Sequence, residues 1–447
     1  MRLPAPLLLL LVGVLIAAGL TWILPAGQFD RREDPVTGRR VVVAGTYHAV
    51  PRAPVGPFAA AVAVARGFVA AADVIAVVLF VGGAWIVVDR LGALDAVISA
   101  LVRTLGSRGL LTIPIVAVFF ASMGALENMQ EEIIPLVPAL LVLGRAVGVD
   151  AMTVVSMSAG AAMVGSAFGP ANPFQAGIAL KLAQLPPLSA AGLRLAGFVA
   201  AVAVWIAWTV RKAAADHRDR PAGVDAARTQ PPSHIPPRKF IVFAVALSPM
   251  AAYIYGVMAR NWGFDELAGA FLIGGCAAGL VGGYGAIETL NVYVEGMQML
   301  LPAGILIGVA RAISLVLEDG RVVDTILDRC ASALGHMAPF AAAFVMVPIH
   351  SAIHVLVPSV SGHAVLTMPV MVPLADLLRL PRLVAVVAYT TGGGLIGECL
   401  SPTNGALLAL LAAAGVPYHK WVRFAIGGVL VATLVGLTMM ALLLRSF

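Results

Sequence analysis

The sequence contains few charged residues and few cysteines. Only 12% of its 447 residues are charged, against roughly one quarter in soluble domains, while 60% are hydrophobic. This shortage of charge excludes a large soluble core. The three cysteines are odd in number and scattered (Cys276, Cys330 and Cys399), which argues against a disulfide framework and against a metal cluster. No Walker motif is present, so no nucleotide-driven pump is indicated.

The net charge of +6 lies largely in loops and does not indicate a nucleic-acid partner. Between the loops, apolar runs long enough to cross about 30 Å of hydrocarbon recur along the chain. Uninterrupted runs lie near 6–25, 110–126, 190–211, 239–258, 266–283, 338–357 and 421–444. The sequence therefore predicts an all-α polytopic membrane protein in a lipid bilayer, with an uncleaved first span.

Two segments far apart in the chain carry the same helix-breaking residues. They are "GAAMVGSAFGPANP" at 160–173 and "GGGLIGECLSPTNG" at 392–405. Four identities align: Gly160 with Gly392, Gly165 with Gly397, Pro170 with Pro402, and Asn172 with Asn404. Because chance would give about one identity in such a window, we interpret the two segments as copies of one unit.

The duplication divides the chain into five parts. They are a first span and polar loop (1–57), repeat 1 (58–211), a cytoplasmic linker (212–238), connecting spans (239–286) and repeat 2 (287–447). Repeat 1 would contain a hairpin at about 127–146 and a broken helix at about 151–183. Repeat 2 would contain a hairpin at about 359–380 and a broken helix at about 383–414. Whether 58–89 forms one span or two decides whether the copies are parallel or inverted, and the residues alone leave both possibilities open.

Each half also contains an apolar stretch too interrupted for a simple span. A re-entrant helical hairpin fits each stretch better, because each carries two prolines spaced for kinks. The expected tips lie near Glu131 and Glu132 in the first half, and near Ser359 and Ser361 in the second. A charge at bilayer depth costs from about 3 kcal/mol upward, so one of these glutamates is expected to bind Na⁺, H⁺ or a substrate amino group, unless both are solvated at the interface.

Non-helical backbone at membrane depth is tolerated only where it is buried in protein or lines a wet cavity. Matching Gly- and Pro-interrupted spans in two halves are the best sequence indication of a transporter's binding site. The breaks free carbonyls for a cation and create helix N-termini suited to a carboxylate. Asn172 and Asn404 would add side chains that both donate and accept, with Ser166, Pro170, Pro402 and Thr403 in the same motifs.

Five other polar residues in apolar surroundings are considered as candidates. Glu398 directly precedes the second break and would coordinate a cation or accept backbone N–H groups. Arg311 would contact a substrate carboxylate or pair with Glu318. His363 lies at the second hairpin. His350 and His354 are four residues apart on one helical face, but two ligands without a third are weak evidence for zinc, and we expect no metal site.

Several segments together resemble one transporter family. They are "WILPAGQFDR", "EEIIPLVPALLVLGRAVGVD", "GSAFGPANPFQAGIA", "GVARAISLVLEDGRVVDTIL", "PSVSGHAVLTMPVMVPLAD" and "SPTNGALLALLAAAGVPYHKW". The chain is similar over nearly its whole length to the YfcC group of the C4-dicarboxylate anaerobic carrier (DcuC-like) family, in the ion-transporter superfamily. Where relatives often have Asn before the second break, this chain has Glu398, and an extra carboxylate there favours a cation.

The resemblance implies two inverted repeats, each contributing a hairpin and a broken helix to a transport domain that moves against a scaffold as an elevator. It also implies a homodimer and a substrate region formed by Glu131, Glu132, Asn172, Ser359, Ser361, Pro402, Thr403 and Asn404. We therefore expect a secondary transporter of a small organic anion, such as a C4-dicarboxylate, or of an amino acid. It would lie in the bacterial cytoplasmic membrane, be coupled to Na⁺ or H⁺, and use no cofactor.

Three alternatives remain at this point. The first is a basic amino acid exchanger of the arginine/ornithine type, favoured by the paired glutamates and Glu398. The second is a channel, which would more often show rings of polar residues from a symmetric oligomer. The third is an intramembrane enzyme, for which the sequence offers neither a nucleophile nor a complete metal set.

Overall fold

The computed structural model describes residues 4–33, 40–94, 96–97, 100, 109–170, 172, 174–186, 189–218, 236–260 and 262–445. These residues are mostly helical, as a bilayer requires, because a helix satisfies its own backbone hydrogen bonds. Among them, nine helices are long and apolar enough to span a membrane. The chain is thus a polytopic helical membrane protein. Most of the predicted linker, at 219–235, lies outside the described residues.

The elements follow the sequence closely. In the first half the helices are α1 (Pro4–Ile23), α2 (Pro57–Ala70), α3 (Ala72–Arg90), η1 (Gly109–Leu111), α5 (Thr112–Glu127), η2 (Glu131–Leu136), α6 (Val137–Val147), α7 (Ala151–Val155), η3 (Ser156–Gly160), α8 (Ala161–Phe168), α9 (Ala176–Leu182) and α10 (Ala191–Arg218). In the second they are α11 (Pro237–Arg260), α12 (Phe264–Gly282), α13 (Ala286–Asp319), α14 (Val323–Gly335), α15 (Pro339–Leu356), α16 (Val360–Leu377), α17 (Arg382–Tyr389), η4 (Thr390–Gly397), α18 (Glu398–Leu400), α19 (Gly405–Ala414) and α20 (Tyr418–Arg445).

The polar loop after α1 adds four short strands that the all-α prediction did not include. Strand β1 (Gly27–Gln28) pairs antiparallel with β4 (His48–Ala49), and β2 (Arg31–Glu33) pairs antiparallel with β3 (Arg40–Val42). The loop is held to α14, because Arg31 forms an ion pair with the buried Asp324 at 2.8 Å. Strand β1 contacts α14 and strand β3 contacts α16, so the loop is packed against these two helices.

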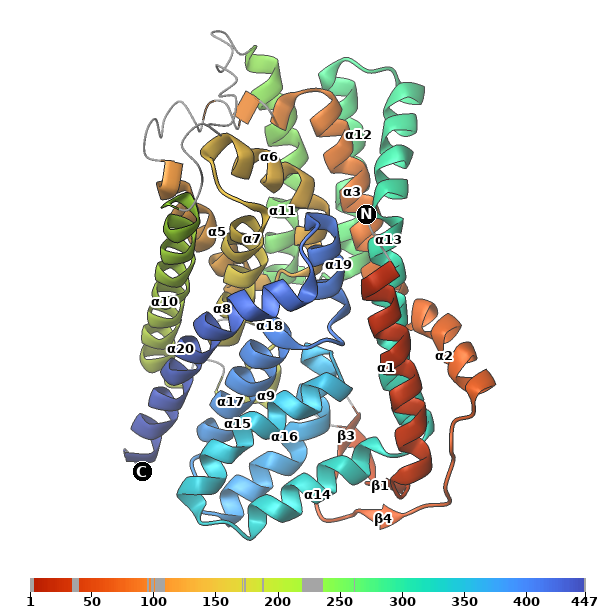
Figure 1. Ribbon diagram of the computed structural model, residues 1–447, viewed down its shortest axis with the longest axis vertical. Coiled ribbons are helices and arrows are strands. Elements are labelled where there is room, and N and C mark those ends of the chain that lie inside the picture. The colour runs from red at the N-terminus through yellow and green to blue at the C-terminus, as the bar shows by residue number, and fades with distance from the viewer. Residues whose placement is uncertain are drawn as a thin grey trace.

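One group of helices is organised around α13. This long helix packs along α2 and α3, with α1 and α12 beside it and α11 against α12 (Figure 1). Small residues let these backbones approach closely: a Cβ added to Gly67 would lie 2.3 Å from the carbonyl oxygen of Gly308. The segment 58–89, at the start of repeat 1, forms two helices, α2 and α3, separated at Ala71. The corresponding start of repeat 2, at 287–318, lies in the single helix α13.

A second group contains the two interrupted helices. The first runs through α7, η3 and α8, breaks, and resumes as α9. The second runs through α17, η4 and α18, breaks, and resumes as α19. In Figure 1 the first runs from α7 down to α9 and the second from α17 up to α19, so their courses are opposite. Opposite courses are what inverted copies would give, and the repeat relationship itself stays a prediction.

Tryptophan side chains satisfy carbonyls along the interrupted helices. Trp205 of α10 donates its Nε1–H to the carbonyl oxygen of Ser156 at 2.8 Å. Trp421 of α20 donates in the same way to Cys399 at 2.8 Å, just before the second break. Both η3 and η4 are π-helical, a form that is rare and frequently found at functional sites. Helices α10 and α20 thus stabilise the irregular backbone from outside.

Two helix pairs complete this group, each joined by a short turn. In the first, α5 ends at Glu127 and η2 begins at Glu131. In the second, α15 ends at Leu356 and α16 begins at Val360. The predicted hairpin ranges, 127–146 and 359–380, cover only the second arm of each pair. The first arms are α5 and α15, which the sequence presents as simple apolar runs.

Candidate functional site

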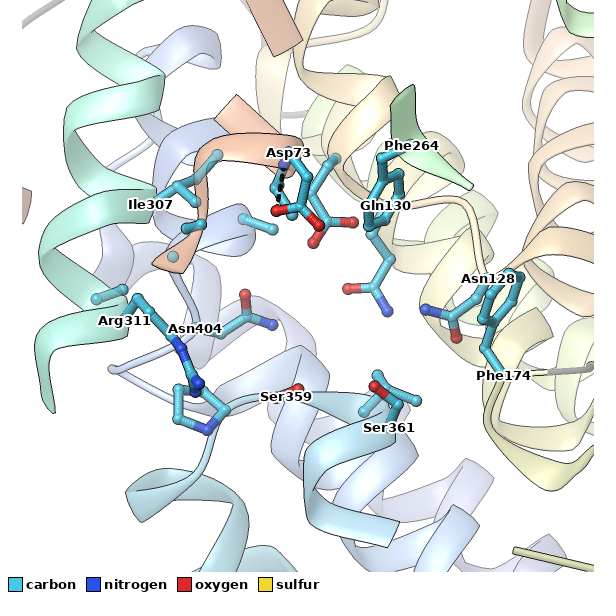
Figure 2. Close-up of a pocket in the computed structure, with 18 of the residues that line it drawn as sticks. Asp73, Asn128, Gln130, Phe174, Phe264, Ile307, Arg311, Ser359, Ser361 and Asn404 are labelled. Atoms are coloured by element: carbon cyan, nitrogen blue, oxygen red, sulfur yellow. Dashed lines mark hydrogen bonds between the residues drawn. The ribbon is translucent and has the colours of Figure 1, made fainter. Parts of the chain in front are cut away.

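The interrupted segments meet at a cavity of about 420 Å³. Both turns of the helix pairs reach it, as do both breaks, the start of α3 and the middle of α13 (Figure 2). A cavity of this volume suits a metabolite-sized ligand. The convergence of four interrupted segments on one cavity is the principal feature of this structure.

The first turn contributes amide and carboxyl groups. Asn128 ends α5 in the left-handed conformation, at φ 60°, which asparagine tolerates better than most residues. Asn128, Gln130, Glu131 and Glu132 all line the cavity. Glu132 is 5% exposed and accepts a hydrogen bond from the backbone N–H of Gln130 at 3.0 Å. Both predicted glutamates therefore reach the cavity, rather than lying apart from it.

The second turn contributes hydroxyl groups. Ser359 caps α16, its side chain accepting a hydrogen bond from the backbone N–H of Gly362 at 3.3 Å. Ser359 and Ser361 line the cavity, and Figure 2 shows them on the wall opposite Asp73. The structure thus brings both predicted serines into the site.

The second break contributes Glu398 and Asn404. Asn404 caps α19, because its Oδ1 accepts a hydrogen bond from the backbone N–H of Leu407 at 3.1 Å. Its Nδ2 donates to Oε2 of Glu398 at 2.6 Å. Both side chains line the cavity while being no more than 5% exposed. The other two predicted residues of this break, Pro402 and Thr403, are not among the lining residues; Thr403 donates to the carbonyl oxygen of Val355 at 2.7 Å.

The first break differs from the prediction. The cavity is lined at this break by Phe174, and not by Ser166, Pro170 or Asn172. Asn172 donates to the carbonyl oxygen of Gly124 at 2.8 Å and accepts from the backbone N–H groups of Phe174 and Gln175. Ser166 donates to the same carbonyl at 3.0 Å. These side chains are occupied in joining the break to α5.

The remaining wall comes mainly from α3 and α13, with Ala70 of α2, Tyr253 of α11 and Phe264 of α12. Asp73, in the first turn of α3, faces the cavity and accepts a hydrogen bond from the backbone N–H of Val74 at 2.8 Å. Arg311 of α13 extends toward the same space beside Asn404 (Figure 2). It donates to Ser314 Oγ at 3.0 Å and lies 3.9 Å from Glu318, so both of its predicted roles, ligand contact and pairing with Glu318, are geometrically available.

His363 does not line the cavity. Its ring lies in a buried cluster with His350 and His354, and His354 Nε2 is 3.3 Å from Oε1 of Glu398. The histidines therefore lie behind the carboxylate that faces the cavity.

Sequence reasoning missed four residues at or near this site. Asp73 was detectable, because an isolated acidic residue in an apolar stretch is by default a functional candidate. Asn128 and Gln130 immediately precede the glutamates that drew attention. Arg194 of α10 is 4% exposed and donates to the carbonyl oxygen of Gly169 at 3.1 Å, placing a positive charge at the C-terminal end of α8. Only the fold brings Arg194 to the first break.

Comparisons with known proteins identify relatives of this chain. Two bacterial relatives align over nearly the full length: an uncharacterised protein of Haemophilus influenzae is 27% identical over 94% of this chain and 93% of its own. The putative basic amino acid antiporter YfcC of Escherichia coli is 28% identical, over 97% of this chain and 94% of its own. Among solved structures, Neisseria gonorrhoeae MtrF, described with a class of antimetabolite efflux pumps, has a TM-score of 0.46 at 16% identity, covering 99% of this chain and 96% of that one.

The Alcanivorax borkumensis YdaH transporter, described as having an unusual topology, has a TM-score of 0.44 at 14% identity and covers 98% of both chains. The sequence profile of the C4-dicarboxylate anaerobic carrier family, DcuC, matches residues 3–445. Because this match covers nearly the whole chain, the protein is a membrane transporter and belongs to the C4-dicarboxylate anaerobic carrier family.

Proposed function

We propose that this protein is a secondary active carrier of a basic amino acid, in the bacterial cytoplasmic membrane. The observation that supports this substrate is the imbalance of charge around the cavity. Four carboxyl side chains line it, from Asp73, Glu131, Glu132 and Glu398, against the single guanidinium of Arg311. A substrate with net positive charge would offset this imbalance, whereas a dianion would increase it.

The amino and carboxylate ends of such a substrate would have different partners. The ammonium and the side-chain cation would lie against the acidic groups of α3 and η2. The carboxylate would lie near Arg311, whose planar guanidinium suits it, and near the start of α19, where Gly405 and Ala406 line the cavity. The N-terminus of a helix favours an anion through its free N–H groups and its dipole.

Movement of the substrate would be an elevator motion of one helix group against the other. The cavity lies where α3 and α13 of the first group face the turns and breaks of the second. A site between two groups can open to either side without unfolding its walls. The homodimer implied by the resemblance would hold the α13 group in place, and this too is part of the proposal.

A C4-dicarboxylate is the second candidate. It is favoured by Arg311, Asn404 and the α19 N-terminus, which together could hold one carboxylate. The acidic residues would then have to bind protons or Na⁺ to accept the second carboxylate. This substrate therefore requires an added cation, whereas a basic amino acid does not.

Thermal unfolding of the purified protein separates the two candidates. L-arginine, L-lysine and L-ornithine should raise the unfolding temperature without Na⁺, because a ligand that binds only the folded state stabilises it. Succinate, fumarate and malate should have no effect, or an effect only with Na⁺ or at low pH. Radiolabelled L-arginine counterflow in proteoliposomes then tests carriage, since an enzyme needs no second compartment.

Glu132→Gln sharpens this test. The variant should bind L-arginine more weakly, by about tenfold for loss of one charged contact, and should shift the pH or Na⁺ dependence of transport. Glu288→Gln is the matched control, because Glu288 lies in the first turn of α13 and does not line the cavity. Stabilisation by succinate but by none of the basic amino acids would reverse the substrate assignment.

A further inference from the structure

Behind the cavity, three buried histidines and one glutamate form a continuous chain. Glu398 Oε1 lies 3.3 Å from His354 Nε2, His354 Nδ1 lies 3.5 Å from His363 Nδ1, and His363 Nε2 lies 3.0 Å from His350 Nδ1. We propose that this chain holds the exchangeable proton that couples transport, so that the coupling ion is H⁺. The inference rests on the proposed carrier function and identifies its driving ion.

The chain is closed to solvent except at Glu398. Each histidine is at most 1% exposed, and Glu398, which lines the cavity, is 4% exposed. Two ring nitrogens in this row have no hydrogen-bond partner among the described residues: His350 Nε2 at the far end, and His354 Nε2, which lies 3.3 Å from Glu398 Oε1 without forming a hydrogen bond. Buried polar atoms without a partner are costly, so their presence in this row calls for an explanation other than packing. A site that takes up a proton provides one.

The second interrupted helix makes room for these rings. A Cβ added to Gly393 would lie 2.7 Å from the His363 ring, and one added to Gly397 would lie 2.5 Å from the His354 ring. The glycines of η4 therefore accommodate imidazoles. Tyr389 fixes them from α17, its ring lying edge-on to those of His350 and His363 at 5.6 and 5.2 Å. The cluster is a built site.

The groups that face the chain come from several elements. Gln130, which precedes η2, and Glu131 at the start of η2 face Glu398, and Glu132 and Asp73 face Glu131 in turn. From the second interrupted helix, Tyr389 and Cys399 face Glu398. Within the described residues, no three of the His, Cys, Asp and Glu side chains converge as metal ligands do. A row of donors and acceptors carries protons better than it binds an ion.

The proton would move by breaking and forming one bond at each step. A proton from water in the cavity binds Glu398 Oε1 and passes to His354 Nε2. His354 then releases its Nδ1 proton to His363 Nδ1, and His363 releases its Nε2 proton to His350 Nδ1. One proton enters, no electrons move, and the reverse sequence returns the rings to their first tautomers.

Loading this proton opposes binding of a cationic substrate. Without the added proton, Glu398 is ionised beside Asn404, so the cavity attracts the cationic substrate. With the proton bound in the row of histidines and Glu398, that negative charge is cancelled and the substrate binds more weakly. Because linkage is reciprocal, binding of the substrate must also expel the proton. The structure thus favours exchange of a proton for the substrate over movement of both in one direction.

Proteoliposomes containing the full-length protein test this with two assays. Counterflow of radiolabelled L-arginine at equal pH measures movement of the substrate. Accumulation driven by an acidic lumen measures proton coupling. His363→Gln should retain counterflow within about twofold while losing about tenfold in proton-driven accumulation, the range of a typical coupling energy. The control is His336→Gln, which replaces an exposed histidine directly after α14 and should change neither counterflow nor proton-driven accumulation.

Each outcome is decisive. If His363→Gln accumulates L-arginine under a proton gradient at the wild-type level, the proposed proton pathway is overturned. If the wild type shows no L-arginine counterflow, the proposed function is overturned instead. His350→Gln replaces the first variant if that one does not fold. A measurement without substrate completes the test: nitrogen NMR of the three rings should show one shared protonation transition as the pH is lowered. Rings that all stay neutral, or titrate independently, would contradict the proposal.

Discussion

The two interrupted helices carry the same motif and use it differently. In the first, Ser166 and Asn172 both donate to the carbonyl oxygen of Gly124 in α5. In the second, Glu398 stands where the first has Ser166, and Asn404 binds Glu398 rather than a neighbouring helix. The first break is fixed to its helix pair, while the second presents ionisable and amide groups to the cavity. The shared motif thus breaks the backbone in both helices, while the side chains at the aligned positions Ser166 and Glu398 have different partners.

The glycine before each motif shows the same contrast. A Cβ on Gly165 would lie 2.0 Å from the backbone oxygen of Ala121, whereas a Cβ on the aligned Gly397 would meet the His354 side chain at 2.5 Å. At this position the first interrupted helix packs backbone against backbone, whereas the second packs against a buried imidazole. At the aligned pair Gly160 and Gly392 the contacts are the other way round, with the Trp205 side chain and the backbone of Val347 respectively.

The largest expected effect tests this contrast in stability. Gly165→Ala should destabilise the fold by about 3 kcal/mol, because neither backbone can shift without moving a whole helix. Gly397→Ala should cost about 1 kcal/mol and instead alter the pH dependence of transport through His354. Thermal unfolding in detergent compares the two variants. Equal losses would show that the two helices are packed alike.

The next effect separates the two asparagines. Asn172→Ala should cost about 2 kcal/mol of stability, because it removes the acceptor for the backbone N–H groups of Phe174 and Gln175 and leaves the buried carbonyl of Gly124 with one donor fewer. Asn404→Ala should cost about 1 kcal/mol as a lost cap but should abolish L-arginine binding. Calorimetric binding, measured on the folded fraction of each variant, checks both statements. Loss of binding in Asn172→Ala without loss of stability would return the first break to the substrate site.

The smallest effect concerns the hydroxyl groups. Ser166→Ala removes one hydrogen bond to a neighbouring helix, at Gly124. Thr403→Val removes one to Val355 of a neighbouring helix and a second to Ser401 within the break. Each should cost about 1 kcal/mol and leave the apparent affinity for substrate unchanged. Transport kinetics at several L-arginine concentrations provide the measurement. A large rise in the half-saturating concentration for Ser166→Ala would contradict its structural role.

Much of this site could be predicted from the sequence. The Gly, Pro and Asn spacing marked both breaks, and acidic residues in apolar surroundings marked Glu131, Glu132 and Glu398. Which asparagine faces the cavity could not be predicted, because the orientation depends on α5 lying against α8. The histidine chain was also hidden: His350 and His354 share one helix, but His363 joins them only because α15 and α16 fold back at Ser359. Nor does any pattern bring Arg194 to Gly169.

The most direct test of the central claim uses one introduced thiol. Cys276 and Cys330 are first replaced by serine. Ser361→Cys then places a thiol on the cavity wall, whereas Ser166→Cys places one in the first interrupted helix, at a residue that does not line the cavity. A water-soluble thiol reagent should modify position 361 readily, and saturating L-arginine should slow that reaction, while position 166 should stay unreactive. Modification at 361 that neither basic amino acids nor dicarboxylates slow, or equal reactivity at 166, would contradict a substrate site at the meeting point of the two turns and the second break.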